Sequence, residues 1–250
     1  MDIITIDFET YYDRDYSLSK MTTESYIRDK RFQVIGVAVK INNGKTEWYS
    51  GNDVGGFLQS FLLSDKYLLA HHSAFDGAIL SWHYNIKPKF WLDTMSMARP
   101  KHNMTIGCSL NALSSYYKLG QKGTEVINAL GKRLEDFTSE ELKNYAQYCI
   151  NDVELTYKLF KVLVKDFPKS ELKVIDQTIR MYTEPEIELD KDLLNDHIAG
   201  IKTNKQKLVD TLATKCSGSG VKKALMSNLI FAELLRKVGV EPPTKVSIRT

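Results

Sequence analysis

The segment FQVIGVAVKI (32–41) limits the fold of this chain more than any other, because it is apolar almost throughout. A run of this kind, without alternating polar residues, is typical of a β-strand that is buried on both faces. Such a strand leaves no face for solvent. We therefore expect it to lie inside a sheet that is covered on each side.

Three further segments have the composition of strands. IITIDF (3–8) alternates and is β-branched, YLLAH (67–71) is a short buried run, and KTEWYS (45–50) follows the turn signal Asn42-Asn43-Gly44. An Asn-Gly turn between two strand-like segments indicates a β-hairpin. We expect residues 32–41 and 45–50 to pair in this way.

Helical patterns dominate the rest of the chain. Thr138 and Glu141 form a capping-box pattern that opens the clearest helix, which we expect to run towards Phe167 and to stop at Pro168. Three more helices are expected at 53–62, from about Ser73 and from Ser109. The predicted strands come first in the chain, and helices follow with one more strand between them. This order predicts an α/β fold in which helices flank a mixed sheet.

The residue pattern of the chain changes after Pro185. Residues 190–215 and 226–238 have helical patterns rich in lysine and leucine, and Ser217–Gly220 forms a flexible link between them. We expect a boundary near 184–190, with a main domain at 1–184 and a helical appendage at 185–250.

Composition narrows the class of protein without identifying it. The chain is 43% hydrophobic with a net charge of +3, which permits a polyanionic partner. It contains no apolar run near the ~18 residues of a membrane span and no signal-peptide pattern at its start. The three cysteines form no CxxC pair, so the sequence indicates neither a disulfide framework nor a zinc site. We expect no membrane association and a cytoplasmic location (the host cytoplasm if the chain is viral).

Two carboxylates lie at the end of the first predicted strand. Side chains at i and i+2 of a strand share a face, so Asp7 and Glu9 point the same way. An ionised carboxylate in a buried strand is costly unless it is paired or binds a cation. The alternative is that both residues cap nearby backbone amides.

Two later segments add acidic and phenolic side chains. Asp76 falls in the first turn of a predicted helix, where the helix dipole alone would favour a carboxylate. Tyr148 and Asp152 are spaced i to i+4, which places them on one face of the long helix. A tyrosine on such a helix is by itself more often part of the core.

Taken in chain order, the DxE of strand one, the Phe75-Asp76 pair and the YxxxD pattern resemble the DEDDy branch of the DnaQ-like 3′→5′ exonucleases. The related histidine branch has a histidine five residues before the last aspartate, and this chain has Gln147 there. The resemblance implies an RNase H-like fold, with a mixed sheet flanked by helices, and a metal-dependent 3′→5′ exonuclease.

The same resemblance implies a cofactor and a role for each residue. Two divalent cations, Mg²⁺ or Mn²⁺, would be held by Asp7, Glu9, Asp76 and Asp152. Asp7 would bridge both cations, Glu9 and Asp152 would complete the water-activating site, and Asp76 would act through the leaving-group cation. Tyr148 would orient the attacking water with its hydroxyl group.

Three substrate contacts follow from the match. Thr10 would meet the terminal 3′-OH, and Phe75 would pack beside the terminal sugar or base. His72 stands where the family usually has asparagine, and it would either contact the substrate or cap the following helix. Asp93 is expected to cap a helix, outside the catalytic set. Basic residues of the irregular middle region either track the DNA backbone or form a solvated surface; they are Arg99, Lys101, Lys118, Lys122, Lys132 and Arg133.

The sequence around these motifs resembles the proofreading domain of phage-type family A DNA polymerases. The C-terminal segment, 185–250, resembles the start of the polymerase thumb. The polymerase palm and fingers are absent from the sequence. The resemblance implies a monomer that acts on a single-stranded DNA 3′ end or a frayed primer terminus, with the missing polymerase domains as a further partner. Two alternatives remain: a free-standing ribonuclease D-like nuclease that trims RNA 3′ ends, and an inactive scaffold with the exonuclease fold.

Overall fold

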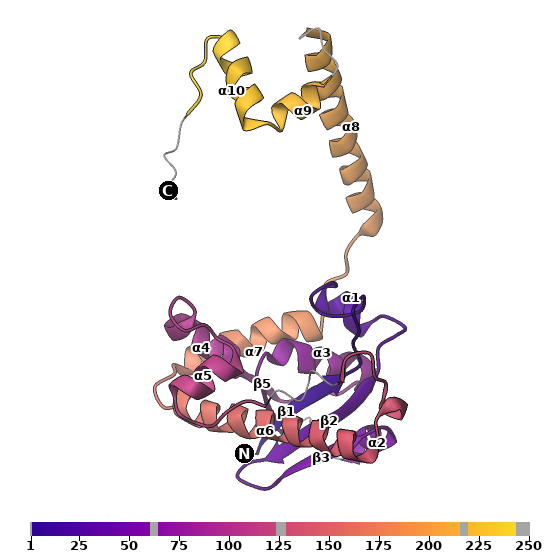
Figure 1. The fold of residues 1–250 in the computed structure, drawn as a ribbon, viewed down its shortest axis with the longest axis vertical. Helices are drawn as coiled ribbons and strands as arrows, with labels where there is room; N and C mark the ends of the chain where they lie inside the picture. Colours follow the sequence, from indigo (N-terminus) through magenta and orange to yellow (C-terminus); the bar gives the residue numbers. More distant parts are fainter. Residues whose placement is uncertain (1, 61–64, 124–128, 216–219, 244–250) are drawn as a thin grey trace. The chain divides into compact units, whose positions relative to one another are not determined.

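A five-stranded mixed sheet organises the first part of the chain (Figure 1). The computed structural model describes residues 2–60, 65–123, 129–215 and 220–243. The strand order is β3-β2-β1-β4-β5; β1, β2 and β3 pair antiparallel, whereas β4 runs parallel to both β1 and β5. The strands are β1 (Ile3–Thr10), β2 (Val34–Ile41), β3 (Thr46–Ser50), β4 (Tyr67–Ala70) and β5 (Phe90–Asp93).

The four predicted strands and the predicted hairpin are confirmed. β2 and β3 pair antiparallel across the Asn42–Gly44 turn, in which Gly44 N–H donates to the Ile41 carbonyl at 2.8 Å. Strand β5 was not predicted, because its four residues, FWLD, are too few to show either alternation or a long apolar run.

Seven α-helices lie in the described part of this region, with a short 3₁₀ turn at Leu134–Asp136. The predicted capping box of Thr138 and Glu141 is confirmed, and Ser109 and Asp93 accept backbone amides as N-caps. The helices are α1 (Thr23–Ile27), α2 (Asn52–Ser60), α3 (Ser73–Tyr84), α4 (Thr94–His102), α5 (Leu110–Tyr116), α6 (Ser139–Leu163) and α7 (Lys169–Thr183).

Two helix boundaries differ from the prediction. Helix α6 ends at Leu163 instead of running to Phe167, because the residue before a proline is pushed out of the helical region and the chain unwinds before Pro168. Helix α2 begins at Asn52, so Asp53 lies within its first turn. The predicted end of that helix, at Phe61 and Leu62, lies outside the described residues.

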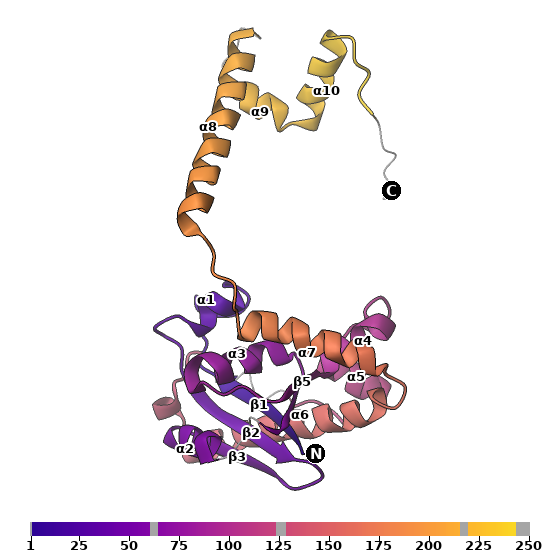
Figure 2. The ribbon, with the colours of Figure 1, turned by 180° about the vertical axis from the view of Figure 1, so that it is seen from behind.

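Helices cover both faces of the sheet (Figures 1 and 2). On one face, Ile4, Ile6 and Phe8 of β1 pack with residues of α3 and with Ile179 of α7. On the other face, α6 packs against β2 through Cys149 and Val153, which form one buried cluster with Ala38. The sheet is therefore the middle of three layers, as the apolar run at 32–41 predicts.

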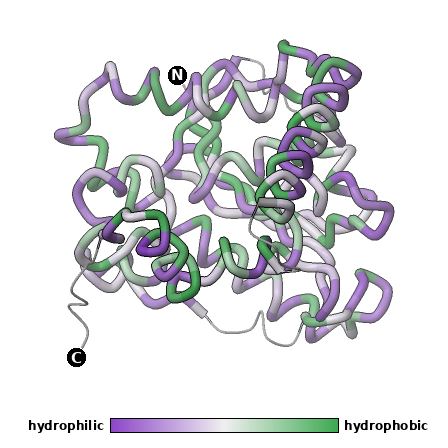
Figure 3. Tube along the Cα trace, turned by 90° about the horizontal axis from the view of Figure 1, so that it is seen from above, coloured by the Kyte–Doolittle hydropathy of each residue, from purple (hydrophilic) through white to green (hydrophobic). Residues whose placement is uncertain are grey.

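The chain divides into two compact units, Met1–Glu186 and Ile187–Thr250, and the second is helical where it is described. It contains α8 (Lys191–Lys215), α9 (Val221–Leu225) and α10 (Asn228–Lys237). Hydrophobic and hydrophilic residues are interspersed along the Cα trace of the chain (Figure 3). The predicted helices at 190–215 and 226–238 are present, α9 was not predicted, and residues 217–219 of the predicted link lie outside the described residues. That 1–184 forms an exonuclease domain and 185–250 the start of a thumb stays a prediction.

A search of the described helices finds none that is long and apolar enough to cross a membrane.

Helix α3 approaches α7 and β5 closely at Gly77, the residue after Asp76. A Cβ atom at this position would lie 2.9 Å from the Thr183 Cγ2 atom and 3.1 Å from the Trp91 ring. Both neighbours are buried and packed. Glycine is therefore required here, and it lets α3 lie against its neighbours.

We predict opposite effects for two glycine-to-alanine substitutions in helices. Gly77→Ala should lower the free energy of unfolding by about 1–3 kcal/mol, because the added methyl group overpacks the contact with Thr183 and Trp91. Gly56→Ala should raise it by about 0.5–1 kcal/mol, because a Cβ atom in this exposed turn of α2 meets nothing within 4 Å. Urea unfolding followed by circular dichroism measures both. Equal effects at the two sites would contradict the close approach.

Candidate active site

The candidate site lies where β1 ends. Asp7 and Glu9 share a face of the strand, opposite Ala38 and Gly36 of β2, and a bulge follows between Glu9 and Thr10. Asp7 is partly exposed, whereas Glu9 is only 9% exposed. Both carboxylates therefore lie between the sheet and the helix that covers this face.

Helix α6 supplies the groups that contact these two carboxylates. The Tyr145 hydroxyl donates to Glu9 Oε2 at 2.6 Å, and the Cys149 Sγ atom lies 3.2 Å from the Asp7 carbonyl and 3.5 Å from Asp7 Oδ2. Neither Tyr145 nor Cys149 is among the site residues that the sequence predicts. Their i to i+4 spacing on α6, in register with Tyr148 and Asp152, is the signal that could have identified them.

Asp76 reaches the site from the first turn of α3. Its Oδ1 atom accepts the Phe8 backbone N–H at 3.0 Å, and its side chain is 2% exposed. This amide is available because β4 pairs with β1 only from Ile3 to Thr5. Beyond that point the parallel strand ends and α3 begins, so the aspartate replaces the missing strand partner.

Tyr148 and Asp152 also lie in the site, and they share a partner from the loop before α6. Lys122 Nζ donates to Asp152 Oδ2 at 2.5 Å and lies 5.1 Å from the centre of the Tyr148 ring. The alternative that Lys122 belongs to a solvated surface is therefore wrong, and its contact with a DNA backbone stays a prediction. The sequence carries no spacing signal for this pair, since 30 residues separate its members.

The charges of the site affect one another. Burial, followed by the charge of Asp152, raises the pKa of Asp7 to about 7. Burial and the neighbouring charge of Asp7 raise the pKa of both Glu9 and Asp76 well above their usual ranges. Burial alone would lower the pKa of Lys122, but the carboxylate of Asp152 and the Tyr148 hydroxyl outweigh it, and the pKa is raised. The four predicted carboxylates are therefore brought together in one electrostatic group.

The donor atoms of this group suit divalent cations. Oxygen atoms of Asp7 and Glu9 and the sulfur of Cys149 all lie within 4.8 Å of one another. Carboxylate oxygens are the ligands that Mg²⁺ and Mn²⁺ prefer, and a cation would offset the repulsion that, together with burial, raises the pKa values. Asp7 and Glu9 therefore fit the metal-binding role that the sequence predicts for them, and the same role of Asp76 and Asp152 stays a prediction.

The three predicted substrate contacts lie in different environments. The Thr10 hydroxyl lies 2.7 Å from the Tyr26 hydroxyl, which itself donates to the Tyr11 carbonyl, so Thr10 is the donor of the pair. Phe75 packs against the Tyr26 ring, with the ring centres 6.2 Å apart. The Thr10 hydroxyl is thus already used within the fold. Substrate contact by Thr10 and Phe75 stays a prediction.

His72 is exposed and has a left-handed backbone, with φ of 81°. Its side chain makes no capping hydrogen bond to α3, so the capping alternative is wrong. The side chain lines a cavity of about 380 Å³ together with residues of α1 and with Tyr182. Contact with a substrate stays a prediction.

Comparisons with known proteins show the fold. No protein-family model and no curated protein sequence matches this chain. Trypanosoma brucei RNase D is similar over 76% of this chain and 68% of its own, with 16% identity and a TM-score of 0.55. Brucella melitensis NrnC is similar over 75% and 89%, with 15% identity and a TM-score of 0.53. The family B DNA polymerase of Pyrobaculum calidifontis is similar over 66% of this chain but only 24% of its own, with 16% identity and a TM-score of 0.50. The predicted RNase H-like fold, a mixed sheet flanked by helices, is confirmed.

The crowding of carboxylates predicts an unusual effect of Asp7→Asn on stability. A carboxyl group whose pKa is raised in the folded state stabilises the fold fully at low pH, and this contribution is lost as pH rises through the folded-state value, here about 7. In excess chelator, the melting temperature of the wild-type protein should therefore fall between pH 5.5 and pH 8.5. Asp7→Asn should fall less and should melt higher than wild type at pH 8.5.

Thermal unfolding by circular dichroism at both pH values tests this, with Asp53→Asn as the control for loss of a charge on an exposed helix. A variant that melts lower than wild type at pH 8.5 would show that Asp7 is held by favourable contacts instead of being repelled.

Proposed function

We propose that this chain is a metal-dependent 3′→5′ exonuclease that hydrolyses phosphodiester bonds at the 3′ end of a single strand. The observation that carries this proposal is the convergence of Asp7, Glu9, Asp76 and Asp152 with Tyr148 at the end of β1. The neighbours in fold support it, since they include nucleases, and one structure of Brucella melitensis NrnC is described as having bound Mg²⁺.

In this proposal the four carboxylates hold two divalent cations, Mg²⁺ or Mn²⁺. When bound, such cations activate water and neutralise charge on the phosphoryl and leaving oxygens. Other residues of the chain keep the carboxylates in place: the Tyr145 hydroxyl fixes Glu9, and the Phe8 amide fixes Asp76. The Tyr148 hydroxyl orients the attacking water, because a phenol is a poor base at neutral pH but a good hydrogen-bond partner.

The narrower proposal is that the substrate is DNA and that the chain is the proofreading part of a family A DNA polymerase. Its support is the resemblance of the segments around Tyr148–Asp152 and of the C-terminal helices to phage-type polymerases. A frayed primer terminus would then be the natural substrate. The appendage would add phosphate contacts that weaken as salt rises.

An RNA substrate is the second candidate, and the neighbours in fold support it equally. Trypanosoma brucei RNase D has been solved in complex with RNA U12, and that structure is similar to this chain over 76% of its length with a TM-score of 0.53. Brucella melitensis NrnC has been solved bound to pGG. An inactive scaffold is less well supported, because closely spaced carboxylates without a cation repel one another.

We predict that the chain shortens a 5′-labelled single-stranded DNA from its 3′ end when Mg²⁺ or Mn²⁺ is present. Asp7→Asn should lower the rate by about 100-fold or more while the fold is retained, since an amide is a much weaker ligand than a carboxylate. Gel analysis of the labelled products measures the rate, and circular dichroism checks the fold. Cleavage that persists in excess chelator, or an unchanged rate in Asp7→Asn, would refute the proposed function.

A second experiment separates the two substrate classes. Matched single strands of DNA and RNA, with one sequence and one 5′ label, are digested side by side under identical metal and salt conditions. We expect the DNA strand to have the higher kcat/KM, as a proofreading domain requires. A clear preference for RNA would leave the nuclease assignment intact and would replace the polymerase reading by the RNase D-like one.

A further inference from the structure

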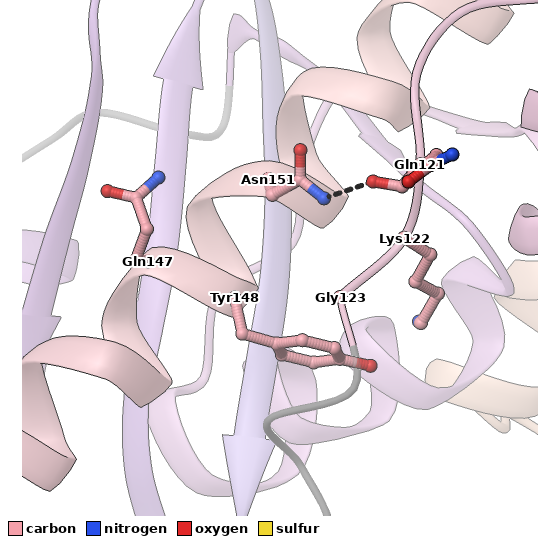
Figure 4. A pocket seen from close by; sticks show the side chains of 6 residues that line it. All are labelled: Gln121, Lys122, Gly123, Gln147, Tyr148 and Asn151. Atoms are coloured by element: carbon pink, nitrogen blue, oxygen red, sulfur yellow. Dashed lines mark hydrogen bonds between the residues drawn. The ribbon is translucent and has the colours of Figure 1, made fainter.

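A lysine that the sequence does not link to the site contacts the site's residues. Lys122 belongs to the loop before α6, and this loop is attached to α6 by a hydrogen bond from Asn151 Nδ2 to the Gln121 carbonyl at 2.9 Å (Figure 4). Asn151 directly precedes Asp152 on the helix. The contact therefore fixes the loop beside the residue that Lys122 binds.

The ammonium group contacts two of the proposed catalytic residues. Lys122 Nζ donates to Asp152 Oδ2 at 2.5 Å, and it lies 5.1 Å from the centre of the Tyr148 ring. In Figure 4 the lysine side chain extends towards the hydroxyl end of the Tyr148 ring. Lys122 and Tyr148 line a cavity of about 380 Å³ with Gln121, Gly123, Gln147 and Asn151. The contacts therefore lie at an accessible edge of the site.

The ion pair differs from an ordinary surface pair. The Asp152 side chain is 5% exposed and that of Lys122 is 30% exposed, so the pair is only weakly screened by water. Exposed pairs contribute little to stability and tolerate replacement, whereas a buried carboxylate that loses a cationic partner is strongly disfavoured. The charge of Lys122 is also close enough to the carboxylate group to affect the pKa of Asp7 and of Glu9.

We propose that Lys122 is a positioning residue of the exonuclease site, a built-in monovalent cation that holds Asp152 and the Tyr148 hydroxyl together for hydrolysis. The proposal rests on the proposed function. Lys122 would then weaken the binding of divalent cations and at the same time speed hydrolysis. As a positive charge inside the site, Lys122 repels divalent cations and weakens their binding. As the group that fixes Asp152 and Tyr148, it speeds the hydrolytic step.

The test compares Lys122→Met with wild type, with Lys122→Arg and with Lys143→Met. Methionine keeps much of the side-chain volume without the charge, arginine keeps the charge, and Lys143→Met removes one charge from an exposed position of α6. Mn²⁺ binding is measured by calorimetry without nucleic acid. The values of kcat and KM are measured on the single-stranded DNA used above, and circular dichroism reports the melting temperature.

Lys122→Met should bind Mn²⁺ at least about 3-fold more tightly, because a repelling charge has been removed. Its kcat should fall by about 10- to 100-fold, the size of effect expected when reacting groups are misplaced, while KM changes by less than about 2-fold. Lys122→Arg should recover most of kcat, and Lys143→Met should match wild type in both measurements.

Each other outcome overturns the proposal. Tighter Mn²⁺ binding with faster hydrolysis would make Lys122 an inhibitory plug, and a raised KM with unchanged kcat would make it a substrate contact. Weaker Mn²⁺ binding together with a lower melting temperature would make its role structural. If wild type cleaves neither DNA nor RNA, the proposed function fails, and unchanged Mn²⁺ binding in Lys122→Met would separately refute the coupling to the metal site.

Discussion

The site depends on one electrostatic constraint: several carboxylates are buried close together at the end of a central strand. Glu9, Asp76 and Asp152 are each less than a tenth exposed, and ionised groups in such positions are costly without partners. Each receives a donor from a different element: a phenol of α6, an amide of β1 and an ammonium group of the loop before α6. These donors do not offset the burial of the carboxylates and their mutual repulsion, which together raise the pKa values of Asp7, Glu9 and Asp76. The fold thus holds together a negative site that favours the binding of cations.

Helix α6 is the element on which this arrangement rests. One stripe of its residues packs on the sheet, with Cys149 and Val153 against Ala38, and the flanking positions carry Tyr145, Tyr148 and Asp152. Since side chains four residues apart stack on a helix, a single rigid element sets the spacing of several site residues. The capping box at Thr138 defines where this helix starts. The packing of α6 on the sheet therefore also determines the geometry of the site.

Much of the fold could be predicted from the sequence, because its signals are local. The apolar run at 32–41, the Asn-Gly turn and the Thr138 capping box each depend on neighbouring residues, and each is confirmed. The five residues of the DEDDy pattern converge as their order in the chain suggests, although their roles stay predictions. Strand β5 was missed because it is too short for any periodicity. Lys122 was missed for another reason: a contact between a loop and a helix 30 residues away leaves no pattern in the sequence.

The balance of charge explains why a lysine belongs in such a site. With all four carboxylates ionised, as cation binding requires, four carboxylates and one ammonium group leave three formal negative charges. Two divalent cations would turn this into one positive charge. Without Lys122, the same two cations would leave the site neutral, with less positive charge to stabilise the negative charge that grows on the phosphoryl group during hydrolysis. With a second lysine, the repulsion between the site and its cations would grow, and the cations would bind less well. One fixed positive charge therefore lets the cations bind and still leaves positive charge for the hydrolytic step.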